Sequence, residues 1–173
     1  AGKPIRIGKL EQFIADFDAD MNLIREKIPP KTRGNVAVIG SGPAGLTVAG
    51  DLAMMGFNVT VYEAEDEPGG VLLYGIPEFR LPKEVVRRET KRISELGVSF
   101  ICNSIVGRDI TIDQMFESGF DAVFIGTGTA ISKELNIPGK ELTGVIQSHY
   151  FLRMVALYNS KSLERKEVPV DEG

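Results

Sequence analysis

The sequence predicts an α/β fold in which a mostly parallel β-sheet carries helices on both faces. Short apolar runs of strand length alternate along the chain with longer stretches whose apolar residues recur at helical spacing. The first run, Val36 to Ile39, is continuously apolar, as in a parallel strand that is covered on both faces. A glycine-rich turn joins this strand to a helix and a second strand, which makes a right-handed βαβ unit.

Each further element follows from the local pattern. We expect a helix at 44–55 ended by Gly56, a strand at 57–62, a loop rich in glycine and proline, a helix at 82–96, a strand at 98–101, a short helix at 111–117, a strand at 122–125 and a helix at 148–158. Upstream, Leu10, Phe13 and Phe17 share one face of an amphipathic turn or two, which the Pro29-Pro30 pair ends. This segment is either a packing arm of the domain or part of a preceding domain.

Composition narrows the class of protein. Of the 173 residues, 43% are hydrophobic and 25% charged, and the net charge of −4 offers no basic surface for nucleic acid. No apolar run approaches the ~20 residues that span a bilayer, and the N-terminus lacks a signal-peptide pattern. We therefore expect a cytoplasmic protein with no nucleic-acid or membrane partner. The single cysteine, Cys102, excludes an internal disulfide, and we expect it to be a buried structural residue.

The strongest motif is a glycine fingerprint between the first strand and its helix. Gly40, Gly42 and Gly45 form a G-x-G-x-x-G pattern, and Glu63 closes the second strand. Gly40 permits a tight turn, Gly42 lets a pyrophosphate approach the backbone, and Gly45 lets the helix pack on the strand. The amide groups that open the helix then face the phosphates. Together these features predict a Rossmann-like dinucleotide site.

Glu63 bears on which dinucleotide binds. Its carboxylate is expected to accept hydrogen bonds from ribose hydroxyls and to repel a 2′-phosphate, which favours FAD or NAD over NADP. A second glycine pair, Gly69-Gly70, lets a loop pass close to a planar ligand, and Arg80 is able to bind a pyrophosphate or to form an ordinary surface ion pair. These residues alone leave both FAD and NAD open.

The segment from Gly69 to Pro82 resembles a known family signature. It reads Gly-Gly-Val-Leu-Leu-Tyr-Gly-Ile-Pro-Glu-Phe-Arg-Leu-Pro and is similar to the small (beta) subunit of bacterial glutamate synthase. Related proteins are the flavin subunit of NADH-dependent ferredoxin:NADP oxidoreductase and dihydropyrimidine dehydrogenase. The likeness continues through Asn103 to Gly107, Asp121 to Gly128 and Ile137 to Gly139, and so covers essentially the whole chain.

The resemblance implies the N-terminal part of a disulfide-reductase-like FAD domain. It also implies a set of residues that bind FAD through the pyrophosphate, the adenosine and the flavin end. By the match these are Gly40, Ser41, Gly42, Pro43, Ala44, Gly45, Glu63, Gly70, Val71, Leu72, Arg80, Val106, Gly126, Thr127 and Gly128. No residue is assigned a catalytic role, because the flavin itself carries out the redox chemistry, and no metal site is expected. We place a helical arm and linker at 1–33, an incomplete FAD-binding domain at 34–159, and a polar tail or linker at 160–173.

The resemblance also implies the cofactors and partners of this chain. In the family, NADPH reduces FAD and electrons pass on to iron–sulfur centres, with a large catalytic subunit or ferredoxin as acceptor. The chain has one G-x-G-x-x-G pattern and no cysteine cluster, so we expect the NADP(H)-binding and iron–sulfur parts to lie elsewhere and this fragment alone to be inactive. Two rivals remain, an NAD-binding regulatory module and an interaction domain without a ligand. His149, the only histidine, is expected to be a helix-start residue with a surface or packing role.

Overall fold

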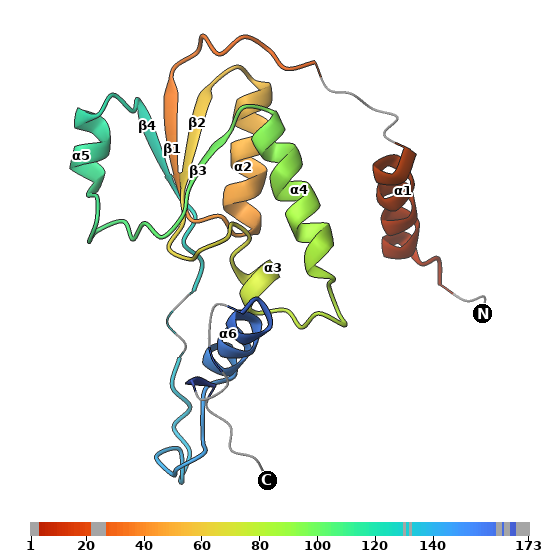
Figure 1. The fold of residues 1–173 in the computed structure, drawn as a ribbon, viewed down its shortest axis with the longest axis vertical. Coiled ribbons are helices and arrows are strands. Elements are labelled where there is room, and N and C mark those ends of the chain that lie inside the picture. Colours follow the sequence, from red (N-terminus) through yellow and green to blue (C-terminus); the bar gives the residue numbers. More distant parts are fainter. Residues whose placement is uncertain are drawn as a thin grey trace.

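A parallel sheet forms the centre of the computed structural model, which describes residues 4–21, 27–129, 131, 133–161, 164 and 167–168. Its four strands are β1 (Asn35–Ile39), β2 (Asn58–Tyr62), β3 (Ser99–Ile101) and β4 (Ala122–Ile125). They lie in the order β3-β2-β1-β4, with every neighbouring pair parallel (Figure 1). Val38 at the centre is in register with Val61 on one side and Phe124 on the other. The predicted α/β class with a parallel sheet is confirmed.

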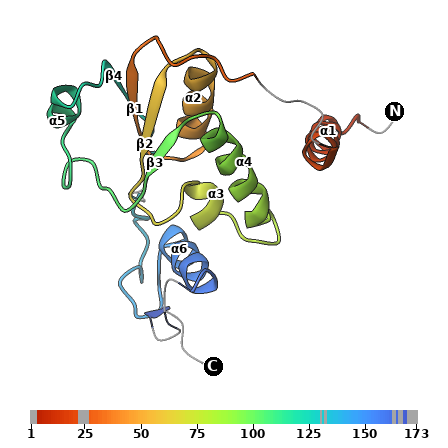
Figure 2. The ribbon, with the colours of Figure 1, turned by 45° about the horizontal axis from the view of Figure 1, so that its top comes forward.

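Helices cover both faces of this sheet, because alternate strand residues point to opposite sides. On one face, helices α2 (Pro43–Met54) and α4 (Lys83–Glu95) cover an apolar cluster that includes Val38, Val61 and Ala49. On the other face, Ala37 and Ile39 belong to a second cluster with Met115 of helix α5 (Ile112–Glu117). Figures 1 and 2 show α2 and α4 on one side of the strands and α5 on the other.

Most predicted boundaries agree with the structure to within one or two residues. Gly56 has a φ of +92° and follows the end of α2, as its role as a helix stop requires. Thr111 and Gln114 form a reciprocal capping box that begins α5. One exception is helix α3 (Val71–Tyr74), which lies inside the predicted loop. A single turn of four residues is too short to produce a helical period in the sequence.

The outer helices differ in how they pack. Helix α1 (Ile7–Met21) is longer than the predicted turn or two and has no buried residue. One ion pair of 3.8 Å, between Asp16 and Arg88, connects it to α4. Helix α6 (Ser148–Asn159) packs against α3, with Leu157 in an apolar cluster with Leu73 and Val86. The predicted polar tail at 160–173 lies largely outside the described residues. Among the described residues, none of the helices is both long enough and apolar enough to cross a membrane.

Candidate functional site

A cavity of about 640 Å³ opens where β1, β2 and β4 end. Its wall includes the residues that directly follow these three strands, namely Gly40, Glu63 and Gly126. In open parallel sheets, ligands bind outside the carboxyl ends of the strands, next to the turns that lead into the helices. The position and size of the cavity therefore match a site for a cofactor-sized ligand.

The three fingerprint glycines do not all have the same structural role. A Cβ on Gly40 would lie 2.6 Å from the carbonyl oxygen of Gly126, and its φ is +92°. A Cβ on Gly45 would lie 1.9 Å from the carbonyl oxygen of Gly40, so the close approach of α2 to β1 depends on this residue. A Cβ on Gly42 would meet nothing within 4 Å. Packing within the protein thus explains Gly40 and Gly45, whereas the space at Gly42 opens into the cavity.

The start of α2 provides donors without partners in the helix. Gly42 is the N-cap and makes no side-chain cap hydrogen bond, and Pro43 at the first helical position has no N–H. The amide groups of Ala44 and Gly45 follow in the first turn, where the N–H groups have no intrahelical acceptor. The helix dipole adds a partial positive charge at this end. This end of the cavity is suited to an anionic group.

Glu63 is held in place at the end of β2. It is 6% exposed, and one carboxylate oxygen accepts hydrogen bonds from the N–H of Ser41, at 2.9 Å, and from the Ser41 hydroxyl. The other oxygen accepts a hydrogen bond of 2.9 Å from the N–H of Glu65. An ionised carboxylate has acceptor capacity beyond these protein contacts. Glu63 can therefore still accept a hydrogen bond from a ribose hydroxyl.

The second glycine pair packs directly on the fingerprint loop. Gly69 donates its N–H to the Ser41 hydroxyl oxygen over 2.9 Å. A Cβ on Gly70, which has a φ of +51°, would lie 2.9 Å from the Cα of Gly42. Gly70 is therefore needed for the loop between β2 and α3 to lie against the turn after β1. A Cβ on Gly69, which has a φ of +150°, would lie 2.7 Å from Cγ of Leu73. The contact between the loop and this turn places Gly70 and Val71 in the wall of the cavity.

The cavity brings together most of the residues that the sequence pointed to. Those found in its wall are Gly40, Ser41, Gly42, Pro43, Ala44, Glu63, Gly70, Val71, Val106, Gly126, Thr127 and Gly128. Gly45 lies behind the turn, against the backbone of Gly40. Leu72 packs beside the apolar cluster formed by α3, α4 and α6. The structure does not bring Arg80 to the cavity, because a turn that follows Pro77 leaves its side chain exposed.

Helix α6 contributes two residues that the sequence analysis did not assign to the site: Arg153, and His149, which was expected only as a helix-start surface or packing residue. His149 and Arg153, four positions apart and so on the same side of the helix, both line the cavity. The Arg153 guanidinium forms a bidentate ion pair with Glu65, with Nε at 2.6 Å from Oε1 and Nη2 at 2.8 Å from Oε2. Hydrogen bonding to Glu65 raises the pKa of Arg153. The helical spacing of His149 and Arg153 is a sequence signal, but Glu65, the partner of Arg153, lies 88 residues away in the chain.

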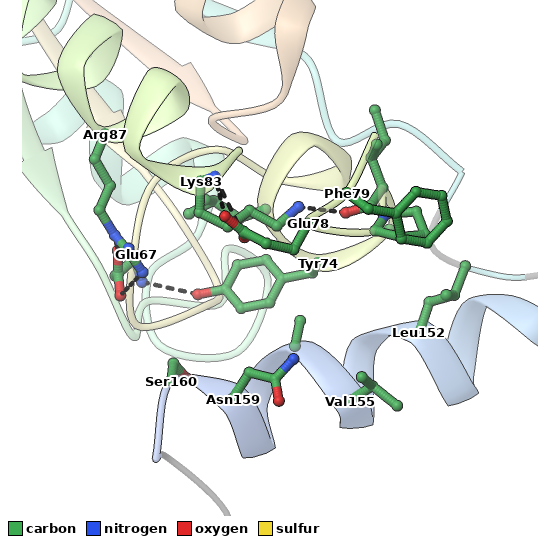
Figure 3. A pocket seen from close by; sticks show the side chains of 15 residues that line it. Glu67, Tyr74, Glu78, Phe79, Lys83, Arg87, Leu152, Val155, Asn159 and Ser160 are labelled. Atoms are coloured by element: carbon green, nitrogen blue, oxygen red, sulfur yellow. Dashed lines mark hydrogen bonds and ion pairs between the residues drawn. The ribbon is translucent and has the colours of Figure 1, made fainter. Parts of the chain in front are cut away.

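A second cavity, of about 340 Å³, lies between α3, the start of α4, and α6 (Figure 3). Its charged groups are engaged within the protein: Lys83 Nζ donates to the carbonyl oxygens of Leu72, at 2.8 Å, and Ile76, and Arg87 pairs with Glu67 at 2.8 Å. Burial lowers the pKa of Lys83. These contacts fix the loop between α3 and α4, and we assign the functional site to the larger cavity.

Comparisons with known proteins agree with this geometry. Residues 34–169 match the sequence model of the pyridine nucleotide-disulphide oxidoreductase family. The glutamate synthase [NADPH] small chain of Bacillus subtilis is 38% identical over 161 residues, 92% of this chain and 32% of that protein. The PreT homolog of Salmonella typhi, a subunit of NAD-dependent dihydropyrimidine dehydrogenase, is 41% identical over 133 residues, 77% of this chain and 32% of that protein.

Among solved structures, FprA of Mycobacterium tuberculosis in complex with NADPH superimposes with a TM-score of 0.61 at 24% identity. The match covers 72% of this chain and 28% of FprA, and it supports the fold. The sequence similarity to the glutamate synthase small chain confirms the resemblance carried by the Gly69 to Pro82 motif. The chain spans about a third of the length of the curated relatives that it matches.

Proposed function

Because the chain belongs to the pyridine nucleotide-disulphide oxidoreductase family, we propose that its larger cavity binds FAD as part of an NAD(P)H-dependent flavoprotein oxidoreductase. The observation that carries the proposal is that two features, at Gly42 and at Glu63, lie in the wall of the same cavity. The space beside Gly42 is open and faces free amides of α2, and the buried carboxylate of Glu63 lies in the same wall. One feature suits a pyrophosphate and the other suits a ribose.

The proposed binding roles follow the wall of the cavity. Ser41 to Ala44 would surround the pyrophosphate, and Glu63 would accept a hydroxyl of the adenosine ribose. The backbone at Val106 would contact the adenine, and the turn at 126–128 would allow close approach of the cofactor. Gly70 and Val71 would lie toward the flavin end. FAD, when bound, supplies the hydride and single-electron chemistry, while the protein binds and orients it.

The proposal also covers the path that electrons take through the enzyme. We expect hydride from NAD(P)H to reduce FAD and electrons to leave singly toward iron–sulfur centres in other parts of the enzyme. The relatives support a multi-component enzyme, because they include a glutamate synthase small chain, a dihydropyrimidine dehydrogenase subunit and the NADP(+)-dependent formate dehydrogenase subunit beta of Moorella thermoacetica. A large catalytic subunit or a ferredoxin is the proposed acceptor. The chain alone would transfer no hydride, because hydride transfer requires a nicotinamide stacked on the flavin.

The first experiment is a visible absorption spectrum of the purified chain, repeated after incubation with FAD and desalting. A retained flavin spectrum, together with a melting temperature that rises with FAD concentration, is the expected result. Binding of NAD without uptake of FAD would instead favour an NAD-binding regulatory module. A chain that binds neither dinucleotide would contradict the proposal for this chain.

A further inference from the structure

The charges around the larger cavity are unevenly distributed. Two carboxylates, those of Glu63 and Glu65, lie in its wall. Arg153 is the one lysine or arginine among the described residues that lines it. A pyrophosphate entering this cavity would meet the partial positive charge of the α2 N-terminus, but a single full positive charge in the wall. The ligand that the fingerprint predicts is therefore opposed by nearby carboxylates unless Arg153 takes part.

Tertiary contacts determine where Arg153 lies. On α6, Met154 and Leu157 are buried, and Leu157 packs with Leu73 of α3. Glu65, three residues beyond β2, then orients the guanidinium through two hydrogen bonds. The side chains of Arg153 and Glu65 are 36% and 23% exposed, so the pair is partly desolvated. A guanidinium held in this way needs little reordering when it binds an anion.

The guanidinium also has N–H donors that Glu65 does not engage. Glu65 engages Nε and one N–H of Nη2, and an arginine has further N–H groups in the same plane. No acceptor for these groups is found in the part of the chain that the structure describes. Phosphate oxygens fit such donors because the guanidinium binds two of them side by side.

We propose that Arg153 is the phosphate-binding cation of this cavity, and that helix α6 thereby forms part of the dinucleotide site. This inference rests on the proposed function and names a contact that the fingerprint does not contain. The Glu65–Arg153 pair orients the guanidinium, and the remaining N–H groups bind the phosphates of the nucleotide. Arg80, which the sequence pointed to for this role, lies on an exposed turn.

The test compares nucleotides that differ in their phosphates. Isothermal titration calorimetry would measure binding of FAD, ADP and adenosine to the intact 173-residue chain and its variants. We expect Arg153→Gln to weaken FAD and ADP binding by about 10- to 100-fold, as for loss of a charge-assisted hydrogen bond, and to leave adenosine binding unchanged. Lys91→Gln, on the exposed side of α4, is the matched loss of a surface charge and should bind all three like the wild type.

A double variant separates a direct contact between Arg153 and the phosphates from neutralisation of the Glu65 charge by Arg153. Arg153→Gln leaves the Glu65 carboxylate unpaired, and that charge alone would repel phosphates. Glu65→Gln combined with Arg153→Gln removes it, so direct contact predicts that ADP binding stays weak. Should Arg153→Gln fail to fold, Arg153→Lys keeps the charge without the planar fork, and an ADP-selective loss of several-fold is expected.

Several outcomes would overturn the inference. These are unchanged ADP binding by Arg153→Gln, equal losses for ADP and adenosine, and recovery of ADP binding in the double variant. An ADP-selective loss in Arg80→Gln with none in Arg153→Gln would give the role to Arg80. All of these leave FAD binding by the wild type intact. A wild-type chain that binds neither FAD nor ADP would refute the proposed function and this inference with it.

Discussion

Ser41 and Glu63 are joined through both polar groups of the serine. The Glu63 carboxylate accepts hydrogen bonds from the Ser41 N–H, at 2.9 Å, and from its hydroxyl, and Gly69 donates to the same hydroxyl oxygen at 2.9 Å. Ser41 is completely buried and Glu63 is 6% exposed. This contact connects the turn after β1, the end of β2 and the second glycine pair, which are the three segments that shape one side of the cavity.

Replacement of Ser41 by alanine should destabilise the fold. The change removes one donor to Glu63 and the acceptor of the Gly69 N–H, and both groups are buried. We expect the free energy of unfolding to fall by about 1–3 kcal/mol, which urea denaturation would measure. Ser94→Ala, at an exposed position of α4, is the control and should stay within about 0.5 kcal/mol of the wild type. Equal effects of the two substitutions would contradict the importance of this contact.

Alanine substitutions at Gly42 and Gly45 should affect different properties: FAD binding at Gly42 and stability at Gly45. At Gly42 a Cβ meets no protein atom within 4 Å, so the free energy of unfolding should change by less than about 1 kcal/mol. The added methyl group lies where we place the pyrophosphate, and FAD affinity should drop by about tenfold or more. Titration with FAD and urea denaturation test the two expectations on the same sample.

At Gly45 the added Cβ would lie 1.9 Å from a backbone oxygen that cannot move without shifting β1 or α2. We expect this variant to lose about 3 kcal/mol or more of stability, as for a severely overpacked site. A stable Gly45→Ala variant, or a Gly42→Ala variant that binds FAD like the wild type, would show that the two glycines do not divide packing and ligand approach in this way.

Glu63 should recognise the ribose through its carboxylate. Wild-type protein is expected to bind ADP about tenfold more tightly than 2′,3′-dideoxy-ADP, because the analogue lacks the hydroxyls that donate to Glu63. In Glu63→Gln that preference should shrink to a few-fold, since a neutral amide is a weaker acceptor. Calorimetry on the two nucleotides measures the ratio. An unchanged preference in the variant would remove Glu63 from the ribose site.

Cys102, which is half-buried and not fully buried as the sequence suggested, should react slowly with alkylating reagents at neutral pH. Burial, and then the negative charges of Glu63, Asp66 and Glu67, raise the pKa of its thiol above the ordinary value of 9.0. Alkylation by iodoacetamide, followed by mass spectrometry across pH, should therefore show a midpoint above 9.0 in the folded protein and a lower one in denaturant. Because the folded pKa is the higher one, the unfolded chain loses the proton first, and the stability due to this group declines as pH rises above the unfolded value.

The local part of the structure could be predicted from the sequence. The order of strands and helices and the Gly40 to Gly45 turn are features of contiguous segments, where hydrophobic period and glycine positions are informative. The placement of Glu63 beside the turn follows as well, because adjacent parallel strands end at the same edge of a sheet. The single turn of α3 could not be predicted, because four residues are too few to show a helical period. The length of α1 was underestimated, although the spacing of Leu10, Phe13 and Phe17 continues to Met21.

Tertiary packing decided which cation reaches the cavity. Arg80 stands in the motif that most resembles the family, yet the turn around it directs the side chain to solvent. Arg153 has no motif of its own, and its partner Glu65 is 88 residues away in the chain. The two meet because apolar residues of α6 bury themselves against α3, and that docking depends on the shape of both surfaces. Sequence alone determined where the proposed nucleotide site begins, because its turn and strand ends are local features. Only the packing of distant helices determined that Arg153 lies in the wall of the same cavity.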